Sequence, residues 1–123
     1  MAGQTLSGLV VVVAGEAPQL VPITQACIAA GASVAVVSRT LPDIEVTLRF
    51  RADPAAPQTW DRVAMHVEQH LGPVDGVATD EASYDAVHAT FAGDLTRRGH
   101  GRVVVVTPDT GASSTISSMV GKP

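Results

Sequence analysis

The sequence has few aromatic residues, one cysteine and no long apolar run. Aromatic residues make up 3% of the 123 residues, so the core must be built from Val, Ala, Leu and Ile, which suits parallel strands covered by helices. The single Cys27 excludes an internal disulfide and fits a reducing compartment. No apolar run approaches the ~20 residues that span a membrane, and the first seven residues lack the features of a signal peptide. These absences predict a cytoplasmic protein with no membrane segment.

Positive charge is also scarce. Eight Lys and Arg residues stand against twelve Asp and Glu residues, which gives a net charge of −4. The basic residues are scattered and no aromatic residues lie between them, so the sequence predicts no nucleic-acid partner. Apolar residues make up 46% and charged residues 16%, which is a globular composition.

Short runs of β-branched residues predict the strands. Residues 9–13, 33–38 and 103–106 are mostly apolar, as expected of strands buried on both faces. Residues 74–78 predict a further short strand. Residues 45–51 instead alternate, with Val46, Leu48 and Phe50 between polar neighbours. This period of two predicts an edge or half-covered strand.

Apolar residues at helical spacing predict three helices between these strands. The first has Leu20, Ile23, Cys27 and Ala30 on one face, and the second is expected to be capped by Thr59. The second helix carries a stripe of Trp60, Val63, Val67 and Leu71, and the third, over Ser83–Arg97, carries Tyr84, Val87, His88, Phe91 and Leu95.

The order strand, helix, strand, strand, helix, strand, helix, strand predicts right-handed crossovers between parallel strands. We therefore expect one Rossmann-type three-layer α/β domain over residues 1–111, with a parallel five-stranded sheet of order 3-2-1-4-5. Residues 112–123 are rich in Ser and Gly and are expected to form a flexible tail.

Several segments, taken in order, resemble the short-chain dehydrogenase/reductase family, especially the β-ketoacyl-carrier-protein reductases. Gly8–Gly15 resembles the first strand and the start of the glycine-rich turn, and residues 31–39 (GASVAVVSR) resemble the second strand. Residues 72–77 (GPVDGV) resemble the approach to the fourth strand, and residues 97–102 (RRGHGR) the approach to the fifth. The resemblance covers about residues 8–111 and implies a Rossmann fold with a nicotinamide cofactor.

The glycine-rich turn departs from the family pattern. The family has T-G-x-x-x-G-x-G, in which glycines let the backbone approach a diphosphate. Here only Gly15 is retained, while Gln19 and Val21 replace the later glycines and Glu16 adds a negative charge. Steric bulk and Coulomb repulsion both oppose the family's cofactor pose.

The catalytic positions depart as well. Alignment with the family places Pro108 at the catalytic serine, and proline has no hydroxyl to donate. The family's Tyr-x-x-x-Lys pair belongs beyond Gly111, where the sequence ends at Pro123. We therefore expect no catalytic residues of the family's kind.

The resemblance still implies candidate cofactor-binding residues. They are Gly15, Ala17, Arg39, Asp53 and Thr79. Arg39 could meet the 2′-phosphate of NADP or be a surface arginine, and Asp53 could lie near an adenine or serve as a turn residue before Pro54. With the turn damaged, we expect no cofactor or weakly bound NAD(P).

Other side chains have a functional and a structural interpretation, and the structural one is preferred. Tyr84 and His88 imitate a Tyr-x-x-x-base spacing but share the apolar stripe of their helix, which favours packing. His66 and His70 are one helical turn apart, but without a third ligand we expect solvated histidines and no metal. Cys27 lies on a buried stripe, where a packed thiol is expected.

The strand at Val103–Val106 predicts a partner. A fully apolar strand at the edge of a sheet is a pairing hazard. We expect this edge and the helix Ser83–Arg97 to be covered by a second copy, forming a homodimer, or by a full-length reductase of the same family.

Three functions stay open. The first is a non-catalytic binding or assembly module, that is, a pseudoenzyme. The second is an NAD(P)-dependent oxidoreductase, or a half-site completed by a partner chain. The third, a flavin or other nucleotide at the carboxyl ends of the strands, would use Gly15, Ala17, Thr79 and Thr107 and has no positive signal in the sequence.

Overall fold

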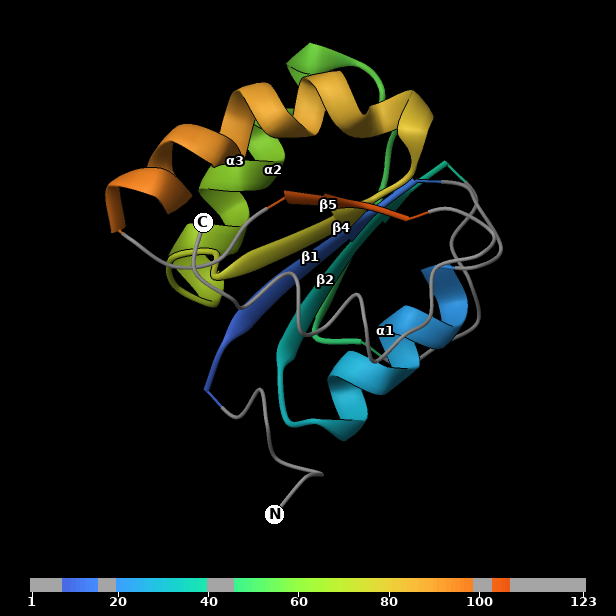
Figure 1. Cartoon of the computed structure of the whole chain (residues 1–123), viewed down its shortest axis with the longest axis vertical. Coiled ribbons are helices and arrows are strands. Elements are labelled where there is room, and N and C mark those ends of the chain that lie inside the picture. The colour runs from blue at the N-terminus through green and yellow to red at the C-terminus, as the bar shows by residue number, and fades with distance from the viewer. Residues whose placement is uncertain (1–7, 16–19, 40–45, 99–102, 107–123) are drawn as a thin grey trace.

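Five short parallel strands form one sheet in the order β3-β2-β1-β4-β5 (Figure 1). The computed structural model describes residues 8–15, 20–39, 46–98 and 103–106. The strands are β1 (Val10–Ala14), β2 (Ser33–Ser38), β3 (Leu48–Arg51), β4 (Gly76–Thr79) and β5 (Val103–Val105). The helices are α1 (Leu20–Ala29), α2 (Pro57–His70), the 3-10 turn η2 (Glu81–Ser83) and α3 (Tyr84–Arg98). The predicted Rossmann-type α/β fold and its strand order are confirmed, whereas the predicted tail 112–123 lies outside the described residues.

Helices cover both faces of the sheet, which gives three layers (Figure 1). Val10, Val12 and Ala14 of β1 face α2 and α3, and Val11 and Val13 face α1. Because successive side chains alternate between the faces, a strand covered on both sides needs apolar residues at every position. The continuous valine run of β1 is therefore explained by its central place in the sheet.

The two edge strands are less buried than the central ones. In β3, Leu48 and Phe50 are half-buried while Arg49 and Arg51 are exposed, as the alternating sequence predicted. In β5 all three residues are half-buried, so the prediction of a strand buried on both faces was wrong for this segment. Its edge position is the reason, because a strand paired on one side only is less enclosed than a central strand.

The start of α2 also differs from the prediction. Thr59 does not cap this helix, because Ala56 occupies the N-cap position and Pro57 begins the helix. Proline suits a first helical position, since its fixed φ is helical and its missing N–H would have no partner there. The backbone N–H of Thr59 donates instead to the carbonyl of Ala56, at 3.0 Å.

The two helices on one face pack through an aromatic pair. The rings of Trp60 in α2 and Phe91 in α3 meet edge to face, with centroids 5.5 Å apart. The indole Nε1 of Trp60 donates a 2.8 Å hydrogen bond to the carbonyl of Pro54, which satisfies its polar atom within the core.

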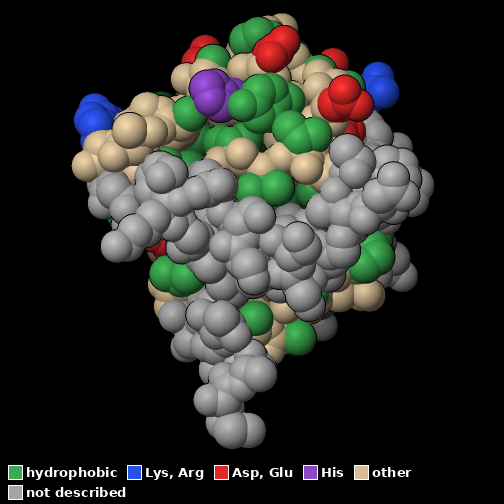
Figure 2. Space-filling view, in the orientation of Figure 1, with side chains coloured by type: hydrophobic (Ala, Val, Ile, Leu, Met, Phe, Trp, Pro, Cys, Tyr) green, Lys and Arg blue, Asp and Glu red, His purple; other side chains and the backbone are tan. Residues whose placement is uncertain are grey.

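Tyr84 and His88 do not belong to the buried stripe of α3, which corrects the sequence interpretation. Val87 and Phe91 form that stripe, while Tyr84 is half-buried and His88 is exposed. In Figure 2 a histidine lies at the surface beside hydrophobic side chains, over the helical layer at the top of the view. No helix in the described ranges is long and apolar enough to cross a membrane.

Candidate functional site

The strands β1 and β4 are neighbours, and their carboxyl ends lie side by side. Open α/β sheets bind ligands at this end of the strands. Gly15 follows β1 with a φ of +139°, and its N–H donates to the carbonyl of Val37 at 3.0 Å. The N–H of Asp80, directly after β4, donates to the carbonyl of Ala14 at 3.2 Å. These bonds hold Gly15 and Asp80 next to each other.

The carboxylate of Asp80 lies against Gly15. A Cβ atom placed on Gly15 would be 2.6 Å from both Cγ and Oδ2 of Asp80, and 2.9 Å from Cδ1 of Leu20. The other carboxylate oxygen, Oδ1, accepts a 3.0 Å hydrogen bond from the N–H of Ser83 and so caps η2. The side chain is therefore held in place by the cap, with one oxygen beside the glycine.

The amino end of α1 is a poor anion site. This helix begins at Leu20, and its third residue, Pro22, has no N–H. A helix N-terminus binds phosphate through its free N–H groups, so one of the few donors of the first turn is missing. Asp80 adds a negative charge at the carboxyl end of β4, close to this helix end. The arrangement therefore disfavours a diphosphate.

The structure brings together some of the residues that the sequence predicted as a cofactor site. Gly15 and Thr79 lie at the ends of the paired strands β1 and β4. Thr79 is fully buried, and its hydroxyl donates to the carbonyl of Asp80 at 3.1 Å. Ala17 lies outside the described residues.

The other two candidates follow the neighbouring strands β2 and β3. Arg39 comes directly after β2 and is exposed. Asp53 comes shortly after β3, is exposed, and accepts a 2.9 Å hydrogen bond from the N–H of Ala55 through Oδ1. Asp53 thus forms the turn that was one of its two interpretations, while its contact with an adenine stays a prediction.

Asp80 was not among the predicted site residues. It is the first of two successive acids, Asp80 and Glu81, that follow the fourth strand, and its contact with the glycine turn was not predicted. The available signal was local, because Asp80 precedes Ser83 by three residues, a spacing typical of a side chain that caps a helical turn.

The paired histidines are not arranged as a chelate. His66 and His70 of α2 stack with ring centroids 4.0 Å apart, and Nδ1 of His70 lies 2.9 Å from the carbonyl oxygen of His66. Within the described part of the chain, no group of three or more His, Cys, Asp or Glu residues could hold a metal ion.

Cys27 is fully buried on the α1 side of the sheet. Burial disfavours the thiolate and raises the pKa of its thiol to about 11. Since the thiolate is the nucleophilic form, the structure agrees with the packed, unreactive thiol that the sequence predicted.

No protein-family model and no curated protein matches this chain, but many solved structures share its fold. Aldohexose dehydrogenase of Thermoplasma acidophilum is 14% identical, with a TM-score of 0.72 over 94% of this chain and 58% of that protein. L-Sorbose reductase of Gluconobacter frateurii, solved with NADPH and L-sorbose, is 16% identical, with a TM-score of 0.66 over 82% of this chain and 52% of that protein. A putative short chain dehydrogenase of Pseudomonas syringae is 15% identical, with a TM-score of 0.70 over 94% and 69%.

The chain thus spans about half to two thirds of the length of these proteins. The likeness confirms a short-chain dehydrogenase/reductase-like fold, as the ordered sequence segments predicted. At these identities the similarity establishes the fold alone.

Proposed function

We propose that this chain is a non-catalytic binding or assembly module built on the short-chain dehydrogenase/reductase fold. The observation that carries the proposal is the position of Asp80, whose carboxylate lies against Gly15 where a dinucleotide's diphosphate would approach the backbone. A bound diphosphate there would meet a fixed negative charge.

Several features near the turn after β1 support this proposal. Leu20 encloses Gly15 from the side of α1, and Pro22 removes a donor from the first turn of that helix. Glu16 adds a further negative charge in the sequence of the turn. Removing a helix N–H and adding carboxylates both weaken the binding of an anion.

The sequence around the last strand gives further support. Pro108 aligns with the catalytic serine of the family, and it lies outside the described residues. A proline side chain has no hydroxyl with which to hold a substrate carbonyl. Substitution at this position opposes the family's chemistry whichever cofactor is bound.

An NAD(P)-dependent oxidoreductase, or a half-site completed by a partner chain, is the second candidate. Gly15 keeps a positive φ at the position of the family's first turn glycine, and Arg39 is exposed at the end of β2. A structural neighbour of this fold was solved with NADPH. In this candidate Gly15, Ala17, Arg39, Asp53 and Thr79 contact the cofactor.

Assembly would use β5 and α3. The outer edge of β5 pairs with no other strand of the described chain, and its three valines are half-buried. The large hydrophobic side chains exposed in the described chain are Ile28 and Met65, and neither lies on α3. The partner is therefore expected to pair with β5 first, as a second copy or a reductase-type chain in a reducing cytoplasm.

Titration with NADPH and NADH tests the proposal. Nicotinamide fluorescence and the melting temperature are followed as cofactor is added, and we expect no saturable change even at high concentration. Saturable binding by the wild-type chain would support the oxidoreductase or half-site instead.

A further inference from the structure

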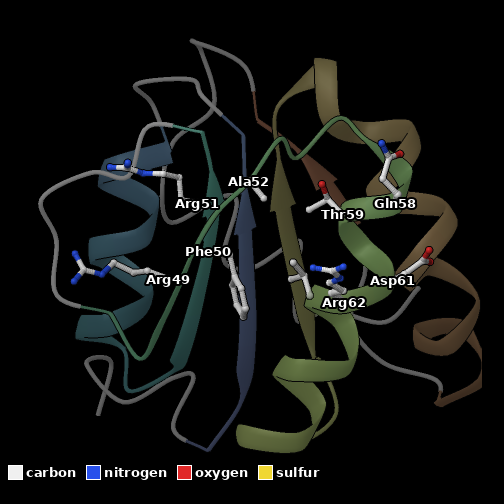
Figure 3. A pocket seen from close by; sticks show the side chains of 9 residues that line it. Arg49, Phe50, Arg51, Ala52, Gln58, Thr59, Asp61 and Arg62 are labelled. Carbon is white, nitrogen blue, oxygen red and sulfur yellow. The ribbon is translucent and has the colours of Figure 1, made fainter.

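A hollow of about 690 Å³ lies between β3 and the first half of α2, away from the carboxyl ends of β1 and β4. Its lining includes Phe50, Ala52 and Val63 as apolar surface, and none of the predicted cofactor residues that the structure describes contributes to it. Figure 3 shows Phe50, Thr59 and Arg62 directed toward the space between β3 and α2, whereas Arg49 and Arg51 extend from the opposite face of β3.

The hollow adjoins the outer edge of β3. β3 is the last strand of the sheet, and no other described strand pairs with its outer side. The N–H of Ala52 donates to the carbonyl of Ser38 at 3.1 Å, so this residue directs its peptide groups toward β2. Because peptide groups alternate in direction along a strand, those of Arg49 and Arg51 are directed to the outer side.

The charge of this edge is positive. Arg49 and Arg51 extend from the face of β3 opposite the hollow (Figure 3). On the side of the hollow, Arg62 of α2 is accompanied by one acidic residue, Asp61. The chain as a whole has a net charge of −4, so the edge differs in sign from the rest of the molecule. A surface of this kind attracts acidic partners and repels another copy of itself, since two such edges would bring their arginines together.

We propose that the outer edge of β3 binds an extended acidic peptide as an added strand. The peptide would exchange backbone hydrogen bonds with Arg49 and Arg51, the two residues whose peptide groups face outward. Its side chains opposite these residues lie on the same face of the sheet, where carboxylates would meet the two guanidinium groups.

The remaining side chains of the peptide would point to the α2 side. There they would contact Phe50 and extend over the hollow toward Arg62. The ring of Phe50 packs edge to face against the ring of His66, with centroids 5.4 Å apart. The site therefore selects a peptide in which acidic and apolar residues alternate, matching the two faces of β3.

The experiment uses an alternating Glu-Val hexapeptide with blocked ends, added to the full chain. Binding is measured by calorimetry and by NMR shifts of the backbone amides. We expect saturable binding that weakens about tenfold or more between low salt and about 0.5 M salt, with the largest shifts at Arg49 and Arg51. The double variant Arg49→Glu/Arg51→Glu should lose binding, while Arg97→Glu, on α3, reverses one charge elsewhere and should retain it.

Two further peptides separate strand pairing from simple charge attraction. A Lys-Val hexapeptide should not bind, and a Glu-Val hexapeptide methylated on every backbone nitrogen should bind much more weakly because it has no N–H groups for pairing. Equal binding of the methylated peptide, no binding of the Glu-Val peptide at low salt, or undiminished binding by the double variant would overturn the proposal. Tight binding of inorganic phosphate alone that displaces the peptide would overturn it in favour of a small-anion site.

The outcome is independent of the cofactor titration. The peptide edge lies at β3, whereas the nucleotide position lies at β1 and β4. Binding of NADPH would contradict the proposed function but not the peptide site. Failure to bind the peptide would contradict the peptide site but not the proposed function.

Discussion

Gly15 and Asp80 directly follow the strands β1 and β4, and a side chain added at Gly15 would displace the carboxylate of Asp80. The carboxylate of Asp80 occupies the space in which a Cβ on Gly15 would lie, at 2.6 Å, while it also caps η2. This contact couples the conformation of the turn after β1 to the charge at the end of β4. Its consequences for stability and for nucleotide binding can be measured separately.

Gly15→Ala is expected to destabilise the fold. The φ of +139° is strained for an alanine, and the new methyl group would have to displace Asp80 from its cap. We expect a loss of about 2–4 kcal/mol in the free energy of unfolding, measured by urea denaturation.

Gly93→Ala provides the matched control for that substitution. Gly93 lies within α3 and is exposed, and a Cβ there meets no atom within 4 Å. Alanine should therefore raise the free energy of unfolding by about 0.5–1 kcal/mol. Equal effects of the two substitutions would contradict the packing of Asp80 against Gly15.

Asp80→Asn tests whether the negative charge of Asp80 opposes the binding of a dinucleotide beside Gly15. The amide oxygen of asparagine can still accept the hydrogen bond from Ser83, so the cap and the shape are retained while the charge is removed. We expect saturable NADPH binding to appear in the variant, with an affinity at least about tenfold above the upper limit for the wild-type chain, which corresponds to about 1.4 kcal/mol. Asp61→Asn makes the same change at an exposed position of α2 and should leave cofactor affinity unchanged. An unchanged affinity in the Asp80 variant would mean that shape, not charge, opposes the cofactor.

Val105→Pro tests pairing at the outer edge of β5. The N–H of Val106 donates to the carbonyl of Thr79 at 2.8 Å, so by alternation the N–H of Val105 is directed outward. Proline there should abolish an assembly formed by strand pairing without breaking the bonds to β4. Val104→Pro removes an inward N–H and should lower stability instead. Light scattering measures the outcome, and a monodisperse monomer of the wild-type chain at micromolar concentration would refute assembly through β5.

Cys27 is expected to make folding stability depend on pH in alkaline solution. Burial raises its thiol pKa from 9.0 to about 11, so the folded state keeps its proton where the unfolded state loses it. The stability linked to this thiol is fully present below pH 9 and is lost as the pH rises from 9 through about 11. Unfolding of the wild-type chain and of Cys27→Ala over this range isolates the effect, because other groups titrate equally in both. A constant difference between the two chains across the range would contradict it.

The same burial predicts the reactivity of Cys27. A disulfide reagent at neutral pH should modify the thiol only after denaturant is added, because the native side chain is fully buried and protonated. Rapid modification of the native chain would show that α1 opens readily from the sheet.

The sequence by itself determined the layers and the order of the strands. The unbroken valines of β1 required cover on both faces, and the alternation of Leu48 and Phe50 with Arg49 and Arg51 required one exposed face. Periodicity records which face of an element is buried, so the buried faces of these two strands could be predicted. The stripe of Leu20, Ile23 and Cys27 was recognised for the same reason.

Only the tertiary structure decided which side chains meet. The contact of Asp80 with Gly15 depends on the pairing of β1 with β4, and the hollow beside Phe50 depends on how α2 lies against the edge strand. His88 fits the spacing of the buried stripe of α3 yet is exposed, because the direction in which the helix faces the sheet decides which neighbouring positions are covered. A periodic pattern fixes the faces of single elements, whereas contacts between elements depend on packing, which no local pattern contains.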